Sequence, residues 1–219
     1  SFNLPFDLLI YGEDDLSFLY EKYKDVEYNF SVGNSLNLMD DLNTFIKNNK
    51  KRDKADSKRG FRFQGIRFSH KVFAVSHAGI NFKDYKYLIW FDADIIFKKT
   101  FNEKFIKRKL TKPDTMMSHL GRSNYHSECG FLIFNMGHQY TQDYLIEMRR
   151  MYTSGDIYKE KEWHDSYIWD VVRERFEKKL KVNNFSISGF QKINDVIGNS
   201  FLNEYFYHLK GKRKFEYKN

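Results

Sequence analysis

Runs of apolar residues alternate with polar turns along this chain and predict a regular series of strands and helices. Strands are predicted at residues 7–11, 26–32, 87–91, 115–120 and 130–134, and helices at 36–46, 63–78 and 139–151 and from His164 onward. Such alternation is typical of an α/β domain. With no linker or repeat to divide the chain, we expect one such domain over residues 1–219, with a mostly parallel central sheet flanked by helices.

The run Tyr87–Phe91 (YLIWF) ends abruptly in Asp92-Ala93-Asp94. A continuous apolar run describes a strand buried on both faces, as in the middle of a parallel sheet, and ligands bind at the carboxyl ends of such strands. In extended backbone Asp92 and Asp94 point the same way, so their oxygens converge as a hard divalent cation requires. The alternative interpretation is an acidic turn that follows a strand.

Other polar residues are placed near this edge by the predicted elements. Lys71 lies beside the apolar stripe of its helix and could reach a phosphate or sugar over the sheet, or simply extend past the core. His164 and Asp165 open a helix, where an aspartate is often a cap and a histidine is often an ordinary surface or core residue. Glu128 belongs to a polar cluster directly before the strand 130–134.

Composition narrows the choice of partner only in part. The net charge is +8, with basic runs at residues 47–62 and 210–218, which suggests an anionic partner unless both runs are solvated loops. Aromatic residues make up 18% of the chain but lie in apolar segments away from the basic runs. They therefore fit core packing better than base stacking, and no nucleic-acid partner is expected.

Cysteine content and hydropathy point to an intracellular protein. Cys129 is the single cysteine, so an internal disulfide and a cysteine-rich zinc site are excluded. No apolar run is long enough to cross a membrane, and the start of the sequence lacks a secretion signal. We expect a cytoplasmic, non-secreted protein without a membrane span.

Four motifs in a fixed order resemble the GT-A type glycosyltransferases, and most closely their glycogenin-like group. They are the DxD of residues 92–94, the segment 128–135 (ECGFLIFN), His164-Asp165, and the sequence HLKGKRK of residues 208–214, which is similar to the family's H-x-x-G-x-x-K. The chain is also similar to glycosyltransferases of large algal viruses that decorate capsid glycoproteins. That setting would place it in the host cytoplasm.

The resemblance implies a metal-dependent transfer of a sugar from a UDP-sugar to a glycan, glycoprotein or other hydroxyl acceptor. Asp92, Asp94 and His208 would hold Mn²⁺ or Mg²⁺, since carboxylates and one imidazole suit these ions. The remaining roles implied are donor binding by Tyr11, Arg62, Arg67, Lys71, Asp92, Gly211 and Lys214, and contact with the transferred sugar by Asp165 and Glu128. A tail from about residue 208 to 219 would close over the donor, and the transfer would retain the anomeric configuration.

The sequence departs from the family at two places, and two other functions remain. Lys214 is followed by Phe215-Glu216 where the family has Pro-Trp, and the helix begins His-Asp-Ser rather than Asp-Gln-Asp. A phosphohydrolase of the haloacid dehalogenase type also has a strand that ends in DxD, although its aspartate strand opens the fold. A basic nucleic-acid-binding domain is the second alternative, and its binding would weaken steeply with salt.

Overall fold

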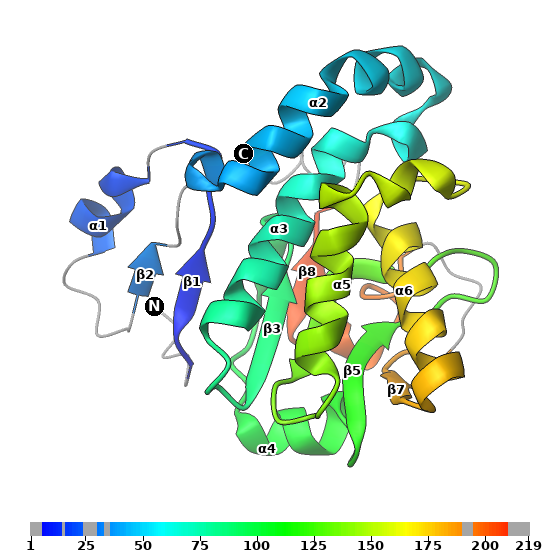
Figure 1. Ribbon diagram of the computed structural model, residues 1–219. Helices are drawn as coiled ribbons and strands as arrows, with labels where there is room; N and C mark the ends of the chain where they lie inside the picture. The colour runs from blue at the N-terminus through cyan, green and yellow to red at the C-terminus, as the bar shows by residue number, and fades with distance from the viewer. Residues whose placement is uncertain (1–5, 15, 24–29, 33–35, 190–194, 210–219) are drawn as a thin grey trace.

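The computed structural model describes residues 6–14, 16–23, 30–32, 36–189 and 195–209. Its largest sheet has four strands in the order β3-β6-β5-β7 (Figure 1). These strands are β3 (Tyr87–Phe91), β6 (Glu128–Asn135), β5 (Thr115–Leu120) and β7 (Asn183–Ser186). No helix within the described residues combines the length and the apolar character needed to cross a membrane.

The expected mixture of strands and helices is confirmed, but the prediction of a mostly parallel sheet is wrong. β6 runs antiparallel to both β3 and β5, and only β5 and β7 are parallel. β3 is also an edge strand of this sheet rather than a central one. A continuous apolar run indicates that a strand is covered on both faces. It does not indicate whether the neighbouring strands are parallel or, as here, antiparallel. Hydropathy therefore gave the burial of β6 correctly, but β3 is only half-buried and the strand directions were not predicted.

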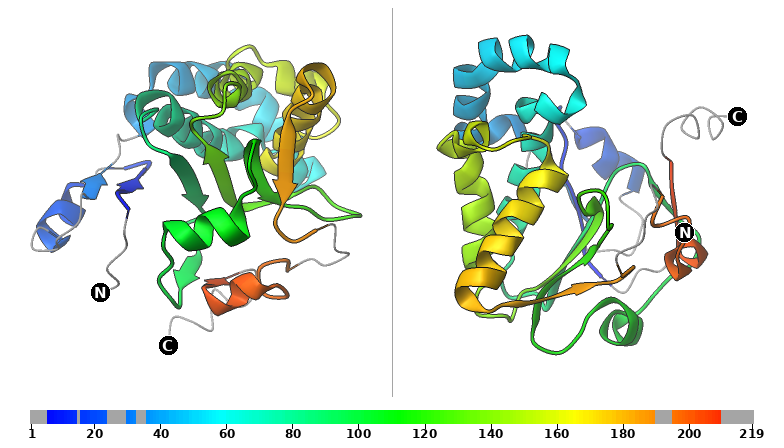
Figure 2. Two further views of the ribbon diagram at one scale, coloured as in Figure 1. Left: turned by 90° about the horizontal axis from the view of Figure 1, so that it is seen from below. Right: turned by 90° about the vertical axis from the view of Figure 1, so that its right-hand side faces the viewer.

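The four longest helices form the larger hydrophobic core against one face of the sheet. The helices are α1 (Ser17–Tyr23), α2 (Asp40–Asp56), α3 (Gly65–Asn81), α4 (Glu103–Phe105, continued by a π-helical turn at Ile106–Leu110), α5 (Thr141–Thr153) and α6 (Asp165–Leu180). α3, α5 and α6 lie side by side over the sheet (Figures 1 and 2). Leu132 and Phe134 of β6 enter this core, together with Trp169 of α6.

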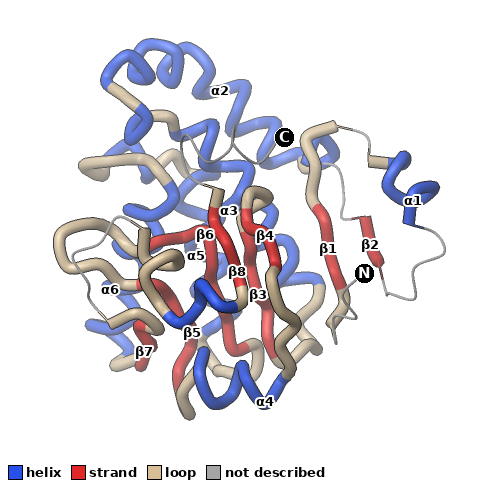
Figure 3. Tube along the Cα trace, turned by 180° about the vertical axis from the view of Figure 1, so that it is seen from behind, coloured by secondary structure: helices blue, strands red, loops and turns tan. Residues whose placement is uncertain are grey.

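The opposite face of the sheet carries a smaller core. Phe131 and Ile133 alternate with the residues above, as strand geometry requires, and pack with Phe206 and Leu110. This face is covered by α4 and by a two-stranded sheet of β4 (Ile95–Phe97) and β8 (Phe206–His208) (Figure 3). β4, β7 and β8 were not predicted, because a strand of three or four residues shows no hydrophobic period unless it lies within a longer patterned segment.

The amino-terminal strands form a separate pair. β1 (Leu8–Ile10) confirms the strand expected at residues 7–11, and it runs parallel to β2 (Phe30–Val32). Short 3₁₀ turns connect several elements. They lie at Leu36–Leu38, Ser57–Arg59, Phe61–Phe63, Asp156–Lys159 and Phe201–Glu204.

The basic run at residues 47–62 is not a loop. α2 continues through it as far as Asp56, with a 3₁₀ turn on either side of Gly60. Lys and Arg are good helix formers on an exposed surface. Two contacts hold the polar half of this helix: Arg52 lies over the Tyr158 ring at 4.5 Å, and Asp53 accepts a hydrogen bond from the backbone of Ile66 at 2.9 Å.

Candidate functional site

The two aspartates of the DxD motif lie between strands β3 and β4. The backbone N–H of Asp92 donates to Gly130 O at 2.9 Å, which extends the β3 pairing with β6 by one residue. Oδ1 of Asp92 accepts a hydrogen bond from Trp90 Nε1 at 2.8 Å and lies 2.8 Å from Lys71 Nζ. One carboxylate oxygen of Asp92 is therefore fixed by two donors, which determines the direction of the other.

His208 joins these aspartates from the far end of the sequence. It is the last residue of β8, pairs with Ile95 of β4 and is 4% exposed. The next residue, Leu209, donates its backbone N–H to Asp94 O at 2.9 Å. The imidazole Nε2 lies 3.0 Å from Asp94 Oδ1, and one ligand atom from each of Asp92, Asp94 and His208 lies within 4.8 Å of the others. The structure thus brings together the three residues that the sequence suggested as metal ligands.

Gly130 leaves room for this group, and it was not among the predicted site residues. A Cβ at this position would lie 2.9 Å from His208 Cε1, 3.2 Å from Glu128 Oε1 and 3.4 Å from Asp92 Oδ2. The first distance is shorter than real Cβ contacts allow. Strand β6 therefore passes so close to the group that any side chain at this position would have to displace the His208 imidazole. The Gly in the segment 128–135 was visible in the sequence, but only the antiparallel pairing of β6 with β3 reveals its use.

Lys71 connects the aspartates to Asp165. Its ammonium lies 2.8 Å from Asp92 Oδ1 and 2.6 Å from Asp165 Oδ2, and it donates to Cys129 O at 3.1 Å. Burial lowers the pKa of Lys71, but the charges of Asp165 and Asp92 outweigh burial and hold it well above its ordinary value. Burial raises the pKa of Asp165, and the ammonium of Lys71 more than reverses this effect. Both groups are charged at neutral pH.

Asp165 does not act as a simple helix cap. It is the first residue of α6 and is 5% exposed. Its Oδ1 accepts from the backbone of the adjacent Ser166 at 2.8 Å, while Oδ2 faces Lys71. The capping interpretation of this aspartate therefore accounts for only one of its two oxygens.

Glu128 lies beside Gly130 at the start of β6 and is 7% exposed. Its Oε1 accepts from the backbone N–H of Gly130 at 3.1 Å, and its Oε2 lies 3.7 Å from Arg122 Nη1. Arg122 also donates through Nε to His126 O at 2.6 Å, which fixes the loop between β5 and β6. Nothing in the sequence indicated that Arg122 contacts Glu128, because Arg122 belongs to none of the four motifs.

The remaining predicted donor-binding residues have other contacts or lie outside the described part. The Tyr11 hydroxyl is 2.8 Å from His77 Nδ1, and burial raises its pKa well above the ordinary value. Arg62 pairs with Glu162 at 2.8 Å, and Arg67 donates to Gln64 at 3.2 Å on an exposed face. Gly211 and Lys214, with the tail beyond Leu209, lie outside the described residues.

Comparisons with known proteins give one distant structural likeness. No family model matches the chain, and no curated protein matches it. The chain is similar to a solved structure described as the crystal structure of a glycosyltransferase involved in the glycosylation of the major capsid of PBCV-1. The two share 12% identity, with 96% of each chain covered and a TM-score of 0.44.

Proposed function

We propose that the protein is a metal-dependent glycosyltransferase that moves a sugar from a UDP-sugar donor to a hydroxyl group of a glycan or glycoprotein, with retention of configuration. One observation carries this proposal: the neighbouring Asp92 and Asp94 converge on one point with His208, which comes from a distant part of the sequence. The order of the DxD, Gly-strand, His-Asp and H-x-x-G-x-x-K motifs supports it, because this order resembles that of GT-A type enzymes.

The donor set of this group fits Mn²⁺, and also Mg²⁺. Two carboxylates and one imidazole form a mixed oxygen and nitrogen site, which suits a fairly hard divalent ion. Gly130 keeps the space beside His208 and Asp92 free of a side chain. When bound, the ion would stabilise the negative charge that develops on the diphosphate as the bond between sugar and phosphate breaks.

Lys71 is best assigned a positioning role in this reaction. An ammonium has three N–H bonds, and those of Lys71 are directed to Asp92, Asp165 and the Cys129 carbonyl. It therefore holds the metal-binding Asp92 and the sugar-facing Asp165 at a fixed separation, rather than reaching out to a phosphate. Loss of this ammonium would leave two carboxylates repelling each other in a largely buried space.

The other donor contacts follow from the resemblance and remain part of the proposal. Asp165 and Glu128 would face the transferred sugar, and Tyr11 would lie near the nucleotide base. Arg62 and Arg67 would attract the donor by charge, and Gly211 and Lys214 would bind the diphosphate and help to exclude water.

A thermal-shift panel of nucleotide sugars with and without Mn²⁺ tests the proposal. A ligand at 100 times its dissociation constant stabilises the folded state by about 2.7 kcal/mol, which is readily measured. We expect stabilisation by UDP-sugars only when Mn²⁺ is present, and little change between 50 and 200 mM salt. Stabilisation by nucleic acid that falls steeply over that salt range would instead support the nucleic-acid-binding alternative.

A further inference from the structure

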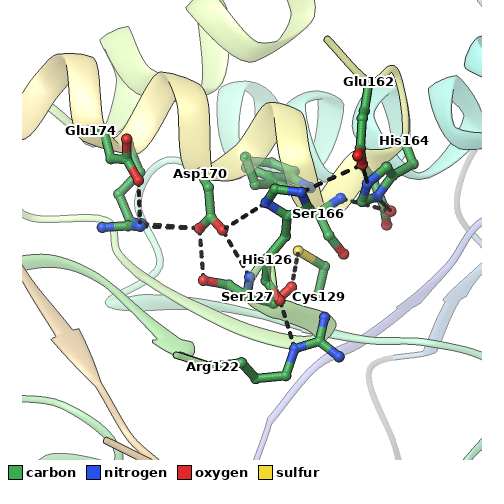
Figure 4. Close-up of polar contacts among 12 residues, drawn as sticks. Arg122, His126, Ser127, Cys129, Glu162, His164, Ser166, Asp170 and Glu174 are labelled. Atoms are coloured by element: carbon green, nitrogen blue, oxygen red, sulfur yellow. Dashed lines mark hydrogen bonds and ion pairs between the residues drawn. The ribbon is translucent and has the colours of Figure 1, made fainter. Parts of the chain in front are cut away.

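A second group of potential metal ligands lies beside the first and contains two histidines and one glutamate. His126 is in the loop before β6, and Glu162 and His164 directly precede α6 (Figure 4). The side chain of His164 is 7% exposed, whereas the side chain of His126 is 34% exposed. The group is therefore anchored in the protein on one side and accessible from solvent on the other.

Both imidazoles direct the same nitrogen to the same carboxylate oxygen. Nε2 of His164 lies 2.8 Å from Glu162 Oε2, and Nε2 of His126 lies 3.4 Å from that oxygen. One ligand atom from each residue lies within 4.8 Å of the others. Zinc bonds of about 2.0 to 2.1 Å in a tetrahedral arrangement place neighbouring ligand atoms roughly 3.3 Å apart. The separation of 3.4 Å matches that value, and the separation of 2.8 Å is a hydrogen bond that needs to lengthen by about half an ångström when its proton is replaced by a metal ion.

A carboxylate lies behind each of the two imidazole rings, just beyond hydrogen-bond distance. Nδ1 of His126 faces Asp170 Oδ2, and Nδ1 of His164 faces Asp165 Oδ1, both at 4.0 Å. Metal-binding histidines commonly have a carboxylate behind the ring, which sets the tautomer and raises the basicity of the ligand nitrogen.

Asp170 and Glu162 are fixed in turn. Asp170 accepts hydrogen bonds from Ser127 N at 2.8 Å and from Ser127 Oγ at 2.7 Å (Figure 4). Arg62 binds the outer oxygen of Glu162, Oε1, at 2.8 Å. The inner oxygen, Oε2, is thereby turned toward the two imidazoles.

We propose that His126, Glu162 and His164 form a second metal site, selective for Zn²⁺ or a similar late transition-metal ion. Two imidazoles and one carboxylate are softer donors than the two carboxylates and one imidazole of the Asp92 group, so the two sites should prefer different ions. Three protein ligands leave a fourth position for water or a substrate group on the side where His126 is exposed. The two sites are joined through Asp165, which contacts Lys71 and faces His164.

Metal titration of the full chain tests this site independently of the transfer reaction. Protein stripped with EDTA is titrated with Zn²⁺ alone by calorimetry, and with Mn²⁺ alone by electron paramagnetic resonance. The variants are His126→Gln and His164→Gln, and His70→Gln on α3 is the matched histidine control. Co²⁺ absorption in the visible range reports the coordination geometry in each variant.

We expect wild type and His70→Gln to bind Zn²⁺ equally, and His126→Gln and His164→Gln to bind it at least about tenfold more weakly with unchanged Mn²⁺ binding. If replacement of the buried His164 prevents folding, His126→Gln still tests the site, because the side chain of His126 is partly exposed. Equal Zn²⁺ affinity in wild type and His126→Gln would overturn the proposal. Loss of Zn²⁺ binding in Asp94→Asn together with normal Zn²⁺ binding in His126→Gln would also overturn the proposal, because the ion would then occupy the site of Asp92, Asp94 and His208.

Discussion

A missing side chain shapes the candidate site as much as the charged residues do. Gly130 lies in β6, where a Cβ would press on His208, Glu128 and Asp92 together. The sequence motifs predicted two of these three neighbours, His208 and Asp92, as metal ligands. The closeness of β6 could not be predicted, because it depends on strand pairing and not on any local pattern.

Gly130→Ala should weaken Mn²⁺ binding about tenfold and destabilise the fold by about 1 kcal/mol or more, since an added methyl group displaces His208 or Asp92. Mn²⁺ titration and urea unfolding measure the two effects. Gly137→Ala is the matched control, because a Cβ there meets only Asn135 Oδ1, at an ordinary 3.6 Å. Equal Mn²⁺ affinity in the two variants would show that the space beside Gly130 is not needed for the metal.

Asp94→Asn should remove the Mn²⁺-dependent stabilisation by UDP while the protein stays folded. The change preserves the shape of the side chain and removes the charge of a proposed metal ligand next to His208. Thermal shifts with UDP and Mn²⁺, together with circular dichroism, measure both properties. Asp84→Asn in an exposed turn is the control. Undiminished metal-dependent binding of UDP by folded Asp94→Asn would contradict the assignment of this aspartate.

His119 should make the fold sensitive to mild acid. Burial, assisted by the charge of Arg173 and opposed by Asp170, lowers the pKa of this histidine to about 4. The unfolded chain, with an ordinary pKa near 6.5, binds the proton more tightly, so the stabilisation is complete above that pH and is lost as pH falls toward 4. We expect a loss of about 2 kcal/mol between pH 7.5 and 5. Urea unfolding at both pH values measures this loss of stability. An equally steep pH dependence of stability in His119→Gln would contradict the assignment to His119.

At the scale of elements, the direction of β6 decides what the site contains. In a parallel sheet, the residues before β6 would lie at the opposite edge from the end of β3. The antiparallel pairing, with Phe91 opposite Phe131, instead places Glu128 and Gly130 beside Asp92. The sequence predicted most strands and helices because their apolar periods are clear. It missed strand direction and the short β4 and β8, which depend on contacts between distant segments.

The pairing of β4 with β8 should separate metal binding from donor binding. Truncation after Leu209 keeps His208 and the backbone bond from Leu209 to Asp94, so Mn²⁺ binding should persist. UDP-sugar affinity should still fall tenfold or more, about 1.4 kcal/mol, because Gly211 and Lys214 are lost. Truncation after Tyr207 should abolish both. Unchanged UDP-sugar affinity after the first truncation would show that the basic tail does not contact the donor.

At the scale of the whole molecule, two hydrophobic cores enclose the four-stranded sheet and hold the site at one edge. The helical layer supplies Lys71 and Asp165, and β6 of the sheet supplies Glu128. Asp92 directly follows β3, and the small β4–β8 sheet supplies His208. The sequence predicted the α/β class and placed these residues near one another through motif order. The covering of the second face by β4, β8 and α4 was not predicted, because no single segment there has a strong hydrophobic pattern.

The stereochemistry of the product depends on this whole arrangement. An inverting transfer needs a carboxylate base within reach of the acceptor hydroxyl, whereas a retaining transfer can use the departing phosphate as the base. The two carboxylates that are proposed to contact the sugar are both engaged by cations or by N–H donors. Asp165 contacts Lys71 and Ser166 N. Glu128 contacts Gly130 N and lies near Arg122. Lys71 also keeps the pKa of Asp165 below its ordinary value, which makes this carboxylate a weak base.

We therefore expect retention of configuration, and proton NMR of the first-formed product measures it directly. Asp165→Asn should lower turnover with little change in UDP affinity, because it weakens the contact with Lys71 while the proposed metal ligands stay in place. Lys71→Met should reduce turnover and also weaken Mn²⁺ binding, since Lys71 contacts Asp92 as well as Asp165. A product whose anomeric configuration is opposite to that of the donor would refute retention, and would reassign Asp165 or Glu128 as the base that deprotonates the acceptor.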